Sequence, residues 1–191
     1  MPPCAITAAR GLACKDTIAG VKAIYLSTFD PTFYAGLTFA TGVWTETVPT
    51  FNAIVRYDVR PNTSGLITEV TNEVAGSAAY TAKLSVVLHK LTQTDNEQLQ
   101  AIIQARFFCW VMDANDVVWS LGLKNGCTVS AATMSVGTAR ADLSGYTMEI
   151  EAGESTFPHE VNPSTDAASD KFPFDAIGGT VDGIPDITNP S

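Results

Sequence analysis

The residues of this chain that could do chemistry are few and scattered. Asp113, Asn115 and Asp116 lie together in the segment MDANDVV, and carboxylate and amide oxygens are the ligands that Ca²⁺ takes in proteins. Glu149 and Glu151 alternate along a strand-like segment, so both project from one face, and a glycosidase uses paired carboxylates as acid, base or nucleophile. Both sets are candidate sites, and both have a simpler explanation.

Turn formation and solvation account for these acids. Asp and Asn side chains form turns by bonding to nearby backbone groups, and the segment 112–118 lacks the glycine and the distal glutamate of an EF-hand loop. Acids at positions i and i+2 usually mark the solvated face of a strand. We therefore expect a turn at 113–116, an exposed strand face at 149–151, and no metal site.

Histidine and cysteine give no clearer motif. His89 and His159 lie far from any G-x-S-x-G elbow, so a nucleophilic triad is not indicated. No C-x-x-C pair and neither common phosphate-binding glycine loop occurs, which argues against zinc and nucleotide sites. The sequence thus predicts no enzyme and no cofactor. The four cysteines are Cys4, Cys14, Cys109 and Cys127.

Two of the cysteines lie within apolar strand patterns. A reduced cysteine in such a place behaves as a small hydrophobic residue, which is our main expectation for Cys109 and Cys127. A disulfide between them stays open as an alternative, because pairing depends on geometry that the sequence does not give.

Composition predicts one folded, soluble domain that does not bind nucleic acid tightly. Of 191 residues, 46% are hydrophobic, and the net charge is −9. Met1 to Ala152 carry 10 basic and 13 acidic residues, and Gly153 to Ser191 carry one and seven. Nucleic-acid binding needs clustered Lys and Arg. The chain has no apolar window of about 18 residues and no signal-like start, so we expect neither a membrane span nor a secretory signal.

Alternating apolar and polar residues predict a mainly β fold. The pattern gives roughly seven or eight strands, two of them in a hairpin over 107–123 whose tryptophans are expected in the core or in cross-strand pairs. Short, closely spaced strands with one helix are typical of a β-sandwich or barrel with a flanking helix. The predicted strand segments are 21–28, 51–61, 66–74, 78–91, 107–123, 127–137 and 145–153.

The single substantial helix is predicted at about 94–106, in TDNEQLQAIIQAR. Thr94 and Glu97 match the T-x-x-E capping box, which stabilises a helix start by about 1 kcal/mol. Leu99, Ile102, Ile103 and Arg106 then fall at helical spacing, with one apolar stripe that can pack on a sheet.

The chain divides into three parts on composition. Residues 1–20 are rich in alanine and small side chains, and 21–153 form the β domain. Residues 154–191 contain five prolines, and their apolar residues follow neither a strand nor a helix period. The last part is predicted to be an extended acidic arm. Its isolated apolar residues, Phe157, Phe172 and Phe174 among them, suggest that the arm docks on a surface.

Arg140 and Asp142 lie in the small, polar loop that precedes the last strand, in SVGTARADLSGYTMEIEAGES. No nucleophile or base accompanies them, so we expect either a charged contact between subunits or a solvated turn. The candidate subunit-interface residues are Arg140, Asp142, Phe157, Phe172 and Phe174.

The succession of capped helix, hairpin FFCWVMDANDVVWSLGLKNG, strand CTVSAATMSVG and loop with strand TARADLSGYTMEIEAGE resembles the C-terminal half of the tail tube proteins of tailed bacteriophages. The resemblance covers about residues 78–154. It implies a β-sandwich or barrel with a flanking helix, and subunits that close into hexameric rings. The rings stack, and their inner strands form a barrel around a channel for DNA.

The same resemblance implies a virion tail protein that is made in the host cytoplasm. Its partners would be further copies of itself, a tail terminator, a baseplate or tip, and a sheath where one is present. DNA would pass through without specific binding, and no membrane would be involved in the assembled tail. The 30–50 loop and the arm would contact neighbouring subunits or rings.

Two other functions stay open from the sequence. A capsid decoration or head–tail connector protein would share the small β domain but would form trimers or a single ring. A carbohydrate-binding or hydrolytic module would differ by an aromatic-lined cleft with paired acids.

Overall fold

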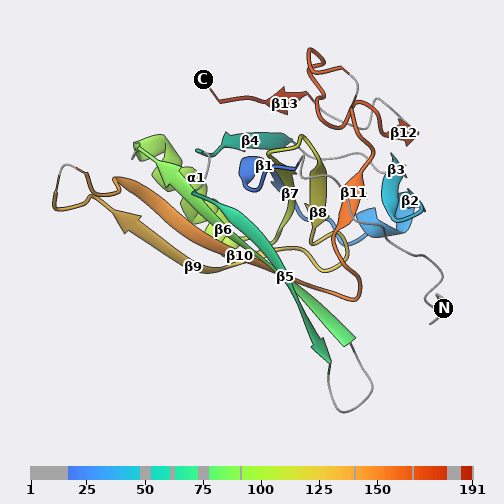
Figure 1. Ribbon diagram of the computed structural model, residues 1–191, viewed down its shortest axis with the longest axis horizontal. Coiled ribbons are helices and arrows are strands. Elements are labelled where there is room, and N and C mark those ends of the chain that lie inside the picture. The colour runs from blue at the N-terminus through green and yellow to red at the C-terminus, as the bar shows by residue number, and fades with distance from the viewer. Residues whose placement is uncertain are drawn as a thin grey trace.

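Two β-sheets and one α-helix form the fold (Figure 1). The computed structural model describes residues 17–47, 53–60, 63–72, 78–90, 92–139, 141–164, 166–179 and 186–190. These residues contain thirteen strands, the α-helix and a short 3-10 helix at Phe33–Gly36. The predicted fold class, mainly β with a single helix, is confirmed.

The larger sheet contains nine strands. They are β1 (Val21–Thr28), β2 (Leu37–Ala40), β3 (Val43–Thr47), β4 (Ile54–Asp58), β7 (Phe107–Asp113), β8 (Val118–Leu121), β11 (His159–Val161), β12 (Gly178–Gly179) and β13 (Ile187–Thr188). Their order is β12-β3-β11-β8-β7-β1-β4-β13, and β2 pairs with β3. The central strands β1 and β7 are buried on both faces, which explains their nearly continuous apolar sequences.

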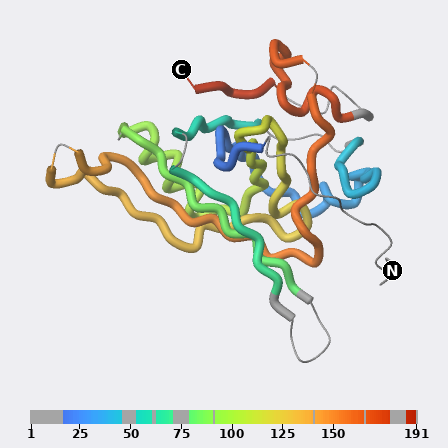
Figure 2. Tube along the Cα trace, in the orientation of Figure 1, coloured from blue at the N-terminus to red at the C-terminus, as the bar shows by residue number. Residues whose placement is uncertain are grey.

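The smaller sheet is antiparallel throughout and has the order β5-β6-β10-β9. Its strands are β5 (Gly65–Asn72), β6 (Ala78–His89), β9 (Thr128–Ser135) and β10 (Gly145–Glu154). Figure 2 shows the β5–β6 and β9–β10 hairpins extending away from the larger sheet in different directions. The strands predicted at 66–74, 78–91, 127–137 and 145–153 all form, with small differences at their ends.

One hydrophobic cluster joins the two sheets. Leu84 and Ile150 of the smaller sheet belong to the same buried cluster as Ile24 and Val111 of the larger one, and each is at most 1% exposed. Strict alternation along β6 and β10 buries every second side chain: Ala82, Leu84, Val86, Ile150 and Ala152 join this cluster, and Tyr146 and Met148 pack with Leu99 of the helix. The sheets therefore pack as a sandwich.

A second, aromatic cluster lies against the other face of the larger sheet. Trp44 and Trp110 stack with ring centroids 6.3 Å apart, and Phe174 meets Trp110 edge to face at 5.2 Å. Such pairs contribute about 0.5–1.5 kcal/mol beyond the area they bury. Trp110 is a core residue, as the sequence predicts, whereas Trp119 is half-buried.

The helix α1 (Gln93–Gln104) forms close to its predicted place, but its cap is different. Thr92, not Thr94, is the N-cap: its hydroxyl oxygen accepts a hydrogen bond from the Asp95 amide at 3.1 Å. Both threonines are followed three residues later by an acid, so the pattern alone does not separate them. The phenol of Tyr146 on β10 bonds to Asn96, which fixes the first turn against the smaller sheet.

The segment after residue 153 packs on its own domain. β11 lies between β3 and β8, and β13 extends the sheet beyond β4. Phe174 and Ile177 are 0% and 1% exposed and belong to the aromatic cluster. The isolated apolar residues of the predicted arm therefore complete a core within the same chain.

The structure contains more strands than the sequence predicts, because several short strands form only by pairing with longer neighbours. The sequence predicts seven or eight strands, and the additional ones are mostly short: β2 and β3, followed by β11, β12 and β13 after residue 154. Strands of two to five residues show too little alternation to be recognised by period, and they exist because longer neighbours provide hydrogen-bonding edges.

The substitution Phe174→Ala should lower the free energy of unfolding by about 3–5 kcal/mol, because it leaves a cavity in a closed aromatic cluster. Urea denaturation followed by tryptophan fluorescence measures the loss. Phe157→Ala is the matched control, since Phe157 is 54% exposed, and it should cost much less. Equal and small losses for both variants would show that the C-terminal segment does not complete the core.

Candidate assembly surface

The smaller sheet has one covered face and one bare face. On the covered face lie the rows Ala82, Leu84, Val86 of β6 and Tyr146, Met148, Ile150, Ala152 of β10, all buried. On the opposite face, Lys83 and Ser85 of β6 and Glu149 of β10 are exposed. The expected solvated face at 149–151 is thus part of a wide polar surface.

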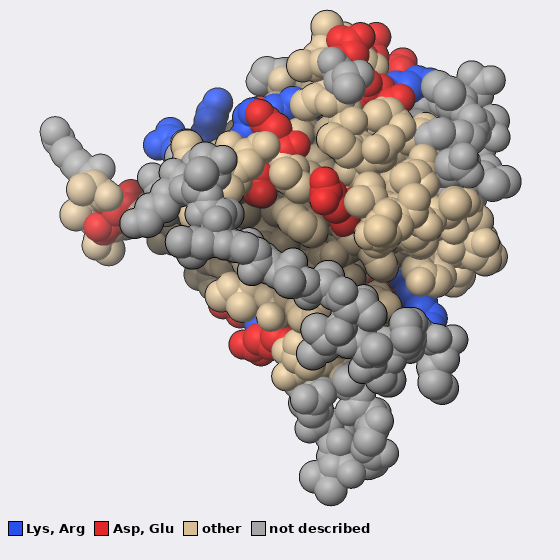
Figure 3. Space-filling model, turned by 45° about the vertical axis from the view of Figure 1, so that its right-hand side comes forward, with Lys and Arg blue, Asp and Glu red and all other residues tan. Residues whose placement is uncertain are grey.

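This bare face carries an excess of negative charge. Lys83 forms an ion pair with Glu69 of β5 at 2.9 Å, and Glu151 lies opposite Lys83 on β10. The hydrogen bond and charge of Glu69 raise the pKa of the Lys83 ammonium, and the charges of Glu151 and Glu149 act in the same direction. The face therefore has three carboxylates for one ammonium. Elsewhere, on the face in view in Figure 3, charged side chains lie in small separate groups.

Both outer strands of this sheet have a free edge within the described residues. β5 pairs with β6 alone, and β9 pairs with β10 alone. Six of the eight side chains of β9 are exposed. Unpaired backbone groups on a long, exposed edge strand are a template for pairing with another chain.

Exposed apolar side chains accompany the two edges. Ile67 and Val70 on β5 are 64% and 45% exposed, and Met134 on β9 is 56% exposed. Next to Met134, the exposed Ile103 of α1 lines a groove of about 260 Å³ between the helix and β9. Such apolar groups beside a free edge mark an interaction site.

No protein-family model, curated protein or solved structure matches this chain. Across the described ranges, the structure contains no helix of the length and hydrophobicity that a membrane crossing requires. In the same part of the chain, no group of three His, Cys, Asp or Glu side chains is placed to hold a metal ion.

The side chain of Asp142 holds together the loop in which it lies. Its Oδ2 accepts hydrogen bonds from the amides of Ala139 and Thr138 at 2.7 and 2.8 Å and from the Thr138 hydroxyl at 2.9 Å. These bonds, that of Ala139 first, lower the pKa of the carboxyl group. Gly137 has φ +75°, and a Cβ there would lie 2.8 Å from that of Asp142. Arg140 lies outside the described residues, so a charged contact between subunits at this loop stays a prediction.

The three phenylalanines predicted at an interface lie in different environments. Phe157 is exposed and packs on Tyr80 with centroids 4.6 Å apart, and Phe172 is half-buried beside the aromatic cluster. Phe174 is fully buried inside its own chain, so it offers no surface to another subunit. Of the three, Phe157 presents the most area to a partner.

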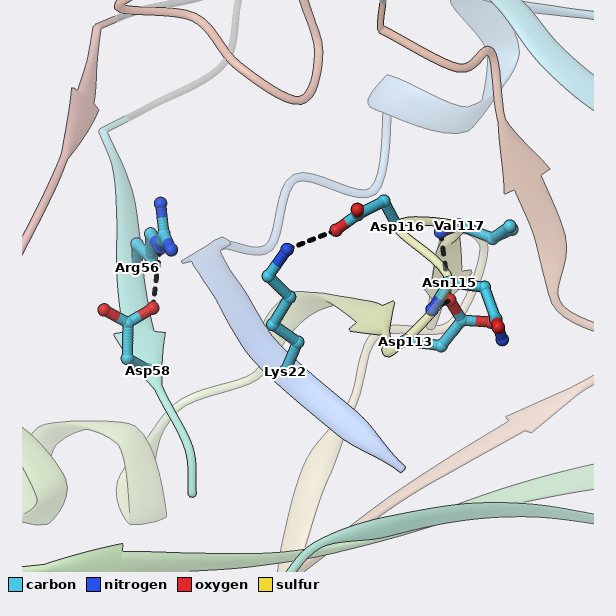
Figure 4. Close-up of polar contacts among 7 residues, drawn as sticks. All are labelled: Lys22, Arg56, Asp58, Asp113, Asn115, Asp116 and Val117. Atoms are coloured by element: carbon cyan, nitrogen blue, oxygen red, sulfur yellow. Dashed lines mark hydrogen bonds and ion pairs between the residues drawn. The ribbon is translucent and has the colours of Figure 1, made fainter. Parts of the chain in front are cut away.

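The acids of the β7–β8 hairpin form a turn, as expected (Figure 4). Asp113 Oδ1 accepts bonds from the amides of Asn115 and Val117 at 2.8 and 3.0 Å. Asp116 forms an ion pair with Lys22 of β1, and the Asn115 side chain bonds to the backbone of Ile18. These side chains are therefore used to attach the turn to the neighbouring strand and to the segment before it.

The histidine on β11 lacks the neighbour that a catalytic triad requires. His159 Nε2 lies 3.3 Å from the Thr156 hydroxyl, and Nδ1 lies 3.0 Å from the carbonyl oxygen of Gly42, where a triad has a carboxylate. The adjacent cavity, lined in part by Tyr34 and Glu154, holds about 20 Å³, room for a single water. This aromatic-lined hollow is too small for a sugar.

Cys109 and Cys127 are both buried and free, which confirms their predicted role as small hydrophobic residues. Burial raises the pKa of each thiol. Cys4 and Cys14 lie outside the described residues.

Ile103 is expected in the apolar stripe of the helix but is 47% exposed, and nothing in the sequence marks Ile67, Val70 and Met134 as residues of an open edge. Each follows an ordinary strand or helix pattern, and exposure at an edge depends on which strand is last in the sheet. The complete absence of charge along CTVSAATMSVG was the one available signal.

Lowering the pH should release the loop of Asp142. The stabilisation that its carboxylate gives to the loop is fully present above the ordinary pKa of aspartate and is lost as pH falls through the lowered pKa. In an NMR titration, the amide signals of Thr138 and Ala139 should shift with a midpoint below the ordinary aspartate value. Asp142→Ala should abolish that transition, and a midpoint at or above the ordinary value would contradict the hydrogen-bonding scheme.

Proposed function

We propose that this chain is a structural subunit of a bacteriophage tail tube, in which copies join into rings, the rings stack, and the channel conducts DNA. The observation that carries the proposal is the four-stranded sheet, which in the described part of the chain has one covered face, one bare acidic face and a free edge on each side. A surface of this kind is suited to joining with copies of itself.

The strand directions favour a closed ring. β5, β6, β10 and β9 alternate in direction, so β9 of one copy and β5 of the next would also be antiparallel. The contact joins two different edges, and such head-to-tail contacts generate rings when the rotation closes. Closure would turn the smaller sheets into one barrel and remove both free edges.

The bare face suits the inner wall of such a ring. With Glu69, Glu149 and Glu151 against Lys83, each copy would contribute a net charge of −2 from these four residues. A negative lining repels the phosphates of DNA and keeps the polymer mobile in the channel.

The resemblance to tail tube proteins supports the same function. The segment that carries it folds as β6, α1, the β7–β8 hairpin, β9 and β10, which follow one another along the chain and contribute to both sheets. The proposed partners are further copies, a tail terminator, a baseplate or tip and, in a contractile tail, a sheath. A connector or decoration protein would differ in forming a single ring or a trimer.

Electron microscopy of the purified protein over a range of concentrations and salt tests assembly directly. We expect stacked rings or tubes with a central channel. A monomer under every condition would refute the proposal, and isolated single rings would favour a head–tail connector instead.

A charge-reversal variant tests which face lines the channel. Assembled Glu149→Lys/Glu151→Lys should bind DNA with an affinity that falls steeply with salt, because four positive units are added per copy where DNA passes. Asp170→Lys/Asp186→Lys adds the same charge at exposed sites in the C-terminal segment and should bind less. Gel shift and co-sedimentation measure binding. Equal binding by the two variants would show that the β10 face does not line the channel.

A further inference from the structure

We infer that β9 of one copy pairs with β5 of the next in one register, with Thr133 opposite Ile67. The inference rests on the proposed ring and names the contact that closes it. The two strands are equally long, eight residues each, and would run antiparallel. Their overlap is largest when Ser135 lies opposite Gly65, which brings Thr133 to Ile67.

Side-chain alternation restricts the choice of register. Thr133 is on the bare face, opposite Thr147, and Ile67 is on the bare face, opposite Lys83. Met134 and Leu66 are on the covered face and would also meet. Because pairing with β6 fixes the two faces of β5, a slip by one residue would set bare-face residues of one copy opposite covered-face residues of the next, for example Glu69 opposite Ala132, so only slips by two residues compete.

The chemistry of the meeting rows is compatible. Leu66 would pack beside Met134 at the groove that Ile103 lines, and the other side chains lining this groove are uncharged. Glu69 would lie opposite Ala131, so no like charges meet across the junction.

The register also gives an acceptable barrel. Residues that lie directly opposite one another define a line across the four strands of one copy, at right angles to the strands. One such line passes through Leu66, Leu84, Ile150 and Val129. Because β9 has a bulge between Val129 and Ala131, this line would reach Val70 of the next copy, four residues beyond Leu66. A shift of about 13 Å along the strands over about 19 Å across four strands tilts them by about 35°, within the typical range of closed barrels. A slip that puts Thr133 opposite Gly65 would reduce the shift to two residues and the tilt to about 20°, whereas a slip that puts Thr133 opposite Glu69 would raise them to six residues and about 45°, so cross-linking has to separate the second alternative.

Cysteine cross-linking of the full-length protein tests the register. In a Cys4→Ser/Cys14→Ser background, Thr133→Cys with Ile67→Cys places both thiols on exposed positions of the bare face. Directly opposite residues in antiparallel strands are close enough for a disulfide. Mild oxidation of assembled protein should give a ladder on a non-reducing gel that ends at the number of copies in a ring.

Two control pairs make the result specific. Thr133→Cys with Val70→Cys puts the thiols on opposite faces and should give no ladder, and Thr133→Cys with Glu69→Cys reports a slip by two residues. A ladder from the Glu69 pair in place of the Ile67 pair would overturn the register. Stacked rings without a ladder from either bare-face pair would overturn the proposed register but leave the proposed function intact, whereas failure of the unmodified protein to assemble would overturn both.

Discussion

The fold depends on the burial of one face of the smaller sheet against the larger one. Leu84, Val86 and Ile150 are at most 1% exposed, and their alternation with polar neighbours fixes the register of β6 and β10, since a slip by one residue would exchange the two faces. The same alternation leaves the acidic side chains on the opposite face. Core packing and the bare surface are therefore two results of one pattern.

The larger sheet is stabilised in a different way. Its central strands are buried on both faces, so it needs cover on the side away from the smaller sheet, and the aromatic cluster around Trp44 and Trp110 provides this cover. Phe174, Ile177 and β11 come from the last forty residues of the chain. The irregular C-terminal segment is thus an integral part of the sandwich. It helps to stabilise the larger sheet, whereas the free edges belong to the smaller sheet.

Free edges are a liability for a monomer, and natural proteins usually shield them with charge, proline or short strands. β9 is eight residues long, uncharged and mostly exposed, and β5 carries Ile67 and Val70 at its surface. These are the two edges that the proposed ring would pair. The carboxylates of Asp142 and Asp113 are used in bonds within the subunit, whereas among the described residues β5 and β9 each pair on one side only.

The sequence by itself determined the β class, the helix at about 94–106, the hairpin over 107–123 and the alternating strands, because each depends on local period or turn chemistry. It misplaced the helix cap by two residues, since Thr92 and Thr94 both satisfy the local pattern. Only the tertiary structure decided that Phe174 is a core residue, that β11 lies between β3 and β8, and that β5 and β9 are the outer strands of their sheet. The physical reason is that burial of an isolated side chain and the position of an edge depend on strands distant in the chain, and short-range periodicity contains no information about those pairings.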